Sequence, residues 1–166
     1  MNTWKLPPRK RRALREGAAA VEFAVVLPLL LLLLLGIWEV GRLVQVSQIV
    51  DNASREGGRL AASGAFTDDG VKIAVCQYMK DAGLPDYTSQ RDTIVTVTNI
   101  SEPGVDSSNA AQLDHIQVTV SIPFKDVRWI ALYLVTNNNT KITAQSDWYS
   151  TRNQSFPTNV TSPPGF

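Results

Sequence analysis

The feature that most constrains this chain of 166 residues is an apolar run near its start. From Ala18 to Trp38 the sequence reads AAAVEFAVVLPLLLLLLLGIW, in which Glu22 is the one charged residue. About twenty such residues, each rising about 1.5 Å along a helix, cross the hydrocarbon core of a bilayer. The alternative is a buried helix of a soluble protein, but residues 29–35 are apolar on every face and a small domain could hardly surround them. The run therefore predicts one transmembrane helix, in which Pro28 predicts a kink rather than an end.

The charges are divided unequally about this run. Residues 1–17 carry six basic residues and one acidic residue, a net charge of +5, whereas residues 18–166 carry ten basic and fourteen acidic residues, a net charge of −4. A basic block beside a membrane helix stays in the cytoplasm according to the positive-inside rule. A nucleic-acid-binding patch is the alternative, but the apolar run follows the block directly. We predict a basic cytoplasmic leader over 1–17, no nucleic-acid partner, and the remaining chain on the opposite side of a membrane.

The apolar run does not look like a cleaved signal peptide. It is longer than a usual signal-peptide core, and no A-x-A site closes it. The residues that follow read EVGRLVQVSQ, and the nearest patch of small residues, 61–65, is far away. The segment is therefore expected to stay in the mature protein.

The helix is expected to continue beyond the membrane. Apolar residues recur there at spacings of three and four, which places them on one stripe of a helix. They are Leu43, Val46, Val50, Ala53, Gly57 and Leu60. The pattern predicts one long helix from about Ala18 to Ser63, in the membrane over 18–40 and amphipathic over 41–64, with Gly64 as its stop.

Two places in this predicted helix stand out. Gly57-Gly58 should weaken the helix locally, because glycine has low helix propensity. Glu39 and Arg42 are three residues apart where the helix leaves the membrane, so they could interact with each other. Solvated interfacial anchors are the favoured interpretation of these two side chains.

Glu22 needs an explanation, because an acidic residue costs roughly 2.5–3.5 kcal/mol at the centre of a bilayer and less near its surface. One interpretation is that its side chain reaches the cytoplasmic surface. The other is that it awaits a positive partner. Cleavage after Gly17 would create an α-amino group at Ala18, four residues before Glu22, which could neutralise the carboxylate within one helix or between staggered neighbours.

Residues 17–23, GAAAVEF, resemble the processing motif of type IV prepilins. The form with glutamate followed by an aromatic residue is similar to that of the Tad, or Flp-type, pilus system. In such proteins a membrane prepilin peptidase cuts after the glycine on the cytoplasmic side. The resemblance implies processing between Gly17 and Ala18, and roles in pilin assembly for Glu22 and Phe23.

The likeness extends over about residues 9–64 and is to the TadE-like family. The sequence GAAAVEFAVVLPLLLLLLLGIWEVGR, followed by DNASREGGRLAASG, is very similar to the N-terminal signature of that family. The matching features are Pro28, Glu39, Gly41-Arg42 and the stretch ASREGGR at 53–59, with Gly58 where an alanine is usual. The resemblance implies a pseudopilin or minor pilin in the bacterial inner (cytoplasmic) membrane, and in the pilus or at the cell surface after assembly. Its implied partners are the membrane, a prepilin peptidase, other pilins and Tad assembly-platform proteins.

The segment 65–150 is predicted to form an extracytoplasmic α+β domain. A short helix is expected over 68–82, capped by Asp68 or Asp69 and ended by Gly83 with Pro85. Alternation of apolar and polar residues predicts strands over 93–100, 114–124 and 141–149. Such strands favour a small antiparallel sheet packed on the amphipathic helix, the pilin-like arrangement that the resemblance also implies. Two further predictions are a short helix or hydrophobic plug over 127–135 and a loose tail over 151–166.

No pattern of catalytic or metal-binding residues is apparent in the sequence. His115 is the one histidine, Cys76 has no disulfide partner in the chain, and Asp68-Asp69 has no metal-ligand spacing after it. We therefore expect no cofactor, no metal, no small-molecule substrate and no enzymatic activity. Two alternatives to a pilin remain: an uncleaved single-pass protein with a periplasmic binding domain, and an anchored periplasmic enzyme.

Overall fold

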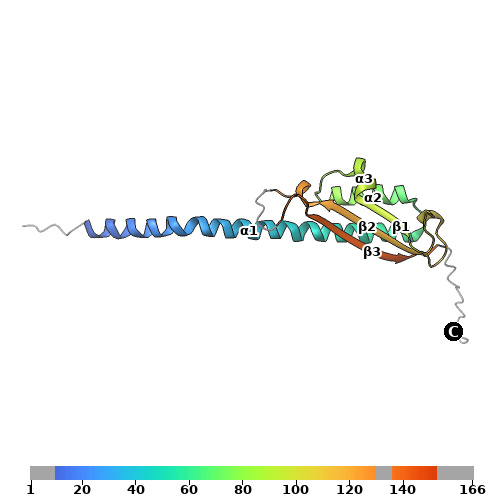
Figure 1. Cartoon of the computed structure of the whole chain (residues 1–166), viewed down its shortest axis with the longest axis horizontal. Coiled ribbons are helices and arrows are strands. Elements are labelled where there is room, and N and C mark those ends of the chain that lie inside the picture. Colours follow the sequence, from blue (N-terminus) through green and yellow to red (C-terminus); the bar gives the residue numbers. More distant parts are fainter. Residues whose placement is uncertain (1–9, 130–135, 153–166) are drawn as a thin grey trace, which may run out of the picture.

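A computed structural model describes residues 10–129 and 136–152, and it contains one long helix whose C-terminal half carries a compact domain (Figure 1). The helix, α1, extends from Lys10 to Ser63, 54 residues, which is about 80 Å at 1.5 Å per residue. The helix begins at Lys10, within the predicted leader, so residues 10–17 of that leader form the first turns of α1. The expectation that Pro28 would not end the helix is confirmed, since Pro28 lies inside α1. Figure 1 shows α1 as a nearly straight rod, so the predicted kink is not seen.

The second half of α1 is part of the core of the domain. Val46, Val50 and Ala53 are fully buried, while Leu43 and Leu60 pack against the core. These residues are the predicted apolar stripe, so its assignment to one buried face is confirmed. Gly64, with a φ of +65°, follows the last helical residue and ends the helix as predicted.

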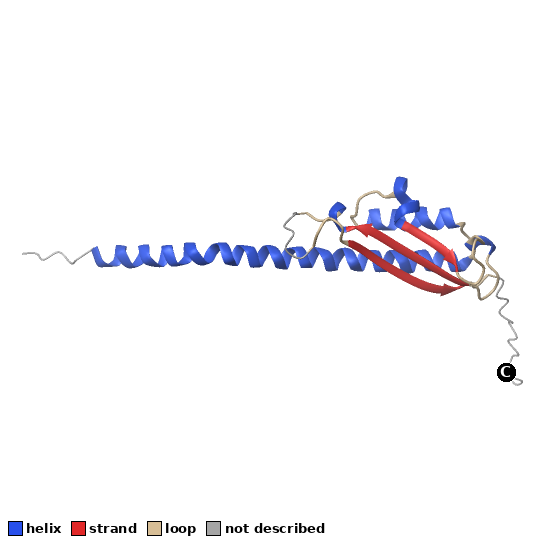
Figure 2. Cartoon of the chain, in the orientation of Figure 1, coloured by secondary structure: helices blue, strands red, loops and turns tan. Residues whose placement is uncertain are grey.

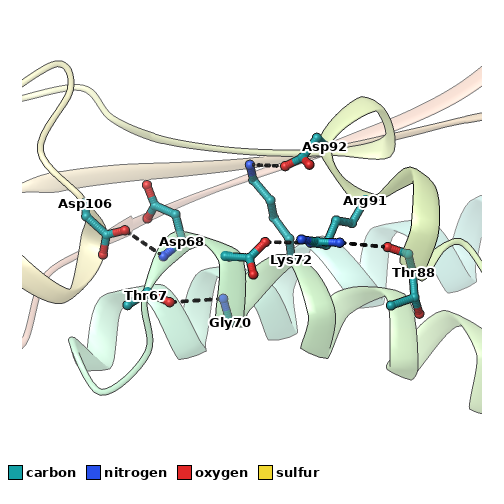
Figure 3. Close-up of polar contacts among 9 residues, drawn as sticks. Thr67, Asp68, Gly70, Lys72, Thr88, Arg91, Asp92 and Asp106 are labelled. Carbon is teal, nitrogen blue, oxygen red and sulfur yellow. Dashed lines mark hydrogen bonds and ion pairs between the residues drawn. The ribbon is translucent and has the colours of Figure 1, made fainter.

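The second helix, α2, spans Asp68–Asp81 and begins at a different cap from the one predicted. The side chain of Thr67 is the N-cap, since its hydroxyl accepts a hydrogen bond from the Gly70 amide at 3.2 Å (Figure 3). The carboxylate of Asp68 instead accepts a hydrogen bond from the Ser107 amide. Asp69 binds the guanidinium of Arg91. The prediction of an aspartate cap is wrong because both carboxylates have tertiary partners.

A short connection follows α2 and is bound back to it. It consists of η1, Thr88–Gln90, and α3, Arg91–Ile94. Lys72 on α2 forms an ion pair with Asp92 at 2.8 Å, and Arg91 reaches Asp69 on α2 as well as the carbonyl of Thr88 (Figure 3). Because α3 includes Ile94, the first predicted strand begins two residues later than expected.

The three strands form an antiparallel sheet in the order β1-β2-β3. They are β1, Val95–Asn99, β2, His115–Pro123, and β3, Lys141–Tyr149. The loop between β1 and β2 contains η2, Ser107–Asn109, and β2 is followed by η3, Phe124–Asp126. The register pairs Val97 with Val118 and Val118 with Ser146. The α+β fold with a small antiparallel sheet is confirmed.

The sheet and the two longer helices make two layers (Figure 2). Alternate residues of β2 point into the core and are fully buried: Ile116, Val118, Val120 and Ile122. Helix α1 packs against β2 and β3, and α2 packs beside α1 and against β1. Cys76 on α2 lies in this core, and its burial raises the pKa of the thiol to about 11, as befits a packing residue.

Both ends of the sheet region return to α1. After β3, the amide of Thr151 donates to the carbonyl of Ala62 near the end of α1. After β2 and η3, Val127, the first residue of the predicted plug, is buried. Residues 130–135 of that plug and residues 153–166 of the predicted tail lie outside the described residues.

Candidate functional site

The processing motif lies on the part of α1 that extends away from the domain. Gly17, Ala18, Glu22 and Phe23 all belong to one exposed helical stretch. A Cβ added to Gly17 would meet no atom within 4 Å. A glycine inside a helix costs about 1 kcal/mol relative to alanine. Since no packing contact among residues 10–129 and 136–152 requires Gly17, its presence is better explained by an interaction outside this chain.

Glu22 is exposed on the same stretch and has no ion-pair partner among the described side chains. Ala18 and Glu22 are separated by four residues, so they lie on one face of the helix, one turn apart. An amino group created at Ala18 would therefore be adjacent to the carboxylate of Glu22.

The apolar part of α1 is not covered by any other described part of the chain. Every residue from 17 to 34 is exposed, including the leucines of the run. In the described part of the chain, one helix is long and apolar enough to cross a membrane, and this is that helix. The hydrocarbon core of a bilayer would be a favourable environment for this apolar surface, because the backbone N–H and C=O groups are already hydrogen-bonded within the helix.

Glu39 differs from its prediction. It is 4% exposed, whereas the sequence predicted a solvated anchor. The hydroxyl of Thr136 donates a hydrogen bond to its Oε1, and within the described residues its Oε2 has no hydrogen-bond partner. The prediction is wrong because the chain after β2 folds back over α1. That contact spans 97 residues of sequence and has no local signal.

Arg42 is also engaged by the returning chain. Its Nε donates to the carbonyl of Val127 at 3.0 Å, and another guanidinium nitrogen donates to Gln45 at 3.0 Å. The guanidinium carbon lies 4.9 Å from the ring centroid of Trp129, a cation–π distance. The helix exit is therefore a site where residues 127–129 and 136 bind α1, rather than a pair of free anchors.

Replacing Thr136 with valine should destabilise this contact. The change keeps the side-chain shape but removes the donor, which leaves the buried Glu39 carboxylate without its hydrogen bond. We expect a loss of about 1–3 kcal/mol in the free energy of unfolding. Thermal unfolding of the full chain in detergent, followed by near-ultraviolet circular dichroism, measures it. Thr143→Val on the exposed side of β3 is the control, and equal shifts for the two variants would count against the contact.

Gly57 and Gly58 are positions of close approach between α1 and the domain. A Cβ on Gly57 would lie 2.6 Å from Cγ2 of Val75 and 3.1 Å from Cγ1 of Val118. A Cβ on Gly58 would overlap the indole of Trp148. The helix is continuous through both glycines. They were predicted as weak points, but their structural role is to let the backbone of α1 approach α2 and the sheet.

Charged residues on the outer side of the same stretch pair with one another. Arg55 binds Asp51 at 3.0 Å, and Arg59 binds Glu56 through two hydrogen bonds. The hydrogen bonding by Arg59 lowers the pKa of the Glu56 carboxyl. Three of them, Arg55, Glu56 and Arg59, line an open cleft together with Asn52, Tyr78 and Trp148. Because its charges are mutually neutralised and exposed, the cleft offers little to a charged ligand.

His115 belongs to a polar cluster on the surface of the sheet. Its Nε2 lies 3.0 Å from Oδ1 of Asp147, and its ring stacks on Tyr149 at 5.3 Å. Gln117 also donates to Asp147, and this bond is the main reason that the pKa of the Asp147 carboxyl is lowered. Among the described residues, no group of three His, Cys, Asp or Glu side chains could hold a metal ion.

A helix that is long and apolar enough to span a membrane and then enters the core of a small α+β domain is the arrangement expected of a membrane-anchored, pilin-like protein. Residues 17–59 match the family model described as TadE-like protein, so the resemblance of this segment to the TadE-like family is confirmed. At a coarse level a TadE-like segment suggests an association with the Tad pilus and its components. No curated protein and no solved structure matches the chain.

The matched segment contains the motif, the apolar run, the helix exit and both packing glycines. The packing around Gly58 also explains one departure from the family pattern described above. The alanine that is usual at the position of Gly58 would collide with Trp148 in this chain. Gly58 and Trp148 are therefore complementary in shape: the missing side chain leaves room for the indole.

Proposed function

We propose that this chain is a TadE-like pseudopilin or minor pilin that takes part in assembly of a Tad pilus or a related secretion or adhesion apparatus. The observation that carries the proposal is the exposed GAAAVEF motif at the start of the segment that matches the TadE-like family. Gly17 supports it in particular, because nothing within 4 Å of that glycine gives it a packing role.

The proposed mechanism follows the chain from its N-terminus. The basic leader holds the N-terminus in the cytoplasm of a bacterial inner membrane. A prepilin peptidase cuts between Gly17 and Ala18. An assembly platform then moves the subunit from the bilayer into a fibre or its base, where Glu22 pairs with an N-terminal amine and the exposed apolar faces of neighbouring helices pack together. The domain after residue 64 takes a binding role and not an enzymatic one.

Sequencing the N-terminus of protein recovered from membranes tests this proposal against the uncleaved alternative. A mature start at Ala18 is the expected result, and an intact Met1 would contradict it.

Gly17→Leu should abolish maturation, because a large side chain would replace the hydrogen at the cleavage site. The measurement is the ratio of precursor to mature protein on an immunoblot. Gly41→Leu is a matched control, since Gly41 is also a helical glycine of α1 with nothing within 4 Å. Normal processing of Gly17→Leu, or equal loss in both variants, would count against the motif.

A further inference from the structure

Two exposed tryptophans meet where α1 enters the domain. Trp38 comes from α1 and Trp129 comes from the chain after η3, and their ring centroids are 6.0 Å apart at an interplanar angle of 54°. Trp38 is 53% exposed and Trp129 is 66% exposed. Arg42, one helical turn after Trp38, has its guanidinium carbon 4.9 Å from the Trp129 ring. These three side chains form a continuous surface, which we name the exit patch.

The exit patch lies at a defined depth along α1. Residues 17–34 are all exposed, and Glu39 is the first buried residue after them. The distance from Ala18 to Trp38 is about 30 Å at 1.5 Å per residue, which is the thickness of the hydrocarbon core of a bilayer. A membrane that contains the apolar run therefore ends at the level of Trp38, and Trp129 lies at that same level.

The chemistry of the exit patch matches a lipid headgroup region. Tryptophan is enriched at membrane interfaces, where its ring contacts acyl chains and its N–H meets polar groups. Arginine can lay its aliphatic stem along apolar surface while its charge stays among the headgroups.

We propose that the outer domain rests on the bilayer through Trp129, so that the exit patch binds the headgroup region of the outer leaflet. The contact holds the domain at the membrane surface instead of on a free helical stalk. It depends on insertion of α1 and is independent of cleavage after Gly17 and of pilus assembly. A second copy of the chain is the rival occupant. However, a stable protein–protein interface buries roughly 800 Å² on each partner. The two indoles and one guanidinium of the exit patch offer a much smaller area than that.

Fluorescence quenching by lipids tests the proposal on the full chain. In one variant Trp4, Trp38 and Trp148 are replaced by phenylalanine, which leaves Trp129 as the reporter. In the matched control Trp4, Trp38 and Trp129 are replaced, which leaves Trp148, a residue of β3 beside Gly58. Both are reconstituted at low density in phosphatidylcholine vesicles whose acyl chains are brominated close to the headgroup. We expect quenching of Trp129 to exceed that of Trp148 severalfold.

A second comparison leaves Trp148 in place, because its replacement could disturb the packing at Gly58. The natural chain and the single variant Trp129→Ala are reconstituted in the same vesicles, and we expect the lipid-quenchable share of emission to fall in the variant. Equal quenching of the Trp129 and Trp148 reporters would overturn the proposal. So would a Trp129 reporter that becomes shielded only when the protein density is raised, since that result would assign the patch to a second copy.

Discussion

Gly57→Leu should lower the free energy of unfolding of the outer domain by about 3 kcal/mol or more. Overpacking a well-packed core costs about 1–3 kcal/mol and sometimes more, and here even a Cβ would lie 2.6 Å from Val75 and 3.1 Å from Val118. Both neighbours are fully buried and β-branched, so their side chains have few alternative rotamers. Relief requires α1 to move away from α2 and the sheet. Such a loss is a large part of the stability of an ordinary domain.

The measurement is thermal unfolding of the full chain in detergent, followed by near-ultraviolet circular dichroism of the domain. Gly41→Leu is the control because it places the same side chain on the same helix where nothing lies within 4 Å. That variant should be neutral or slightly stabilising, as leucine has the higher helix propensity. Equal unfolding temperatures for the two variants would show that Gly57 does not set the distance between α1 and the domain.

Glu22→Ala should leave processing intact but strongly reduce assembly. A carboxylate in the bilayer raises the free energy of the membrane-resident subunit, by up to roughly 2.5–3.5 kcal/mol at the bilayer centre. Pairing with an N-terminal amine in the fibre would remove that cost. Alanine therefore stabilises the membrane-resident state and removes the pairing from the assembled state. Both effects shift the subunit toward the membrane.

The assembly prediction is measured as the share of mature protein in sheared fibres relative to membranes. Val21→Ala, a change of the neighbouring exposed residue of α1, is the control and should assemble normally. Wild-type piliation with Glu22→Ala would refute the pairing role. Failure of cleavage in that variant would instead assign Glu22 to recognition by the peptidase.

The parts of the fold that the sequence predicts well are those with a local periodic signal. The alternation from residue 141 to 149 matches β3 residue for residue, and the spacing of Val46, Val50 and Ala53 identifies the buried face of α1. Gly64 and Gly83 were predicted as helix ends, and both have positive φ. In each case the physical cause acts within a few residues of sequence.

The missed features depend on contacts between distant segments. Glu39 looked solvated because its hydrogen-bond donor, Thr136, is 97 residues away. Gly57 and Gly58 looked like helix defects because Val118 and Trp148 approach them only in the folded chain. Asp68 is an excellent cap residue by type, yet Ser107 engages its side chain and leaves the capping role to Thr67. The motif at 17–23 could be recognised from the sequence because its proposed role depends on a short contiguous stretch and on partners outside this chain, and not on contacts between distant segments of the fold.

The continuity of α1 has a mechanical consequence. The same rod of backbone hydrogen bonds is exposed over residues 17–34 and is part of the core at Val46 and Val50. The described residues contain no linker between these two parts. A force applied along the axis at the buried end of α1 is therefore transmitted directly to its apolar end, and a rotation of one end also rotates the other. An assembly machine that binds the domain could thus pull the apolar half of α1 out of a membrane or rotate it.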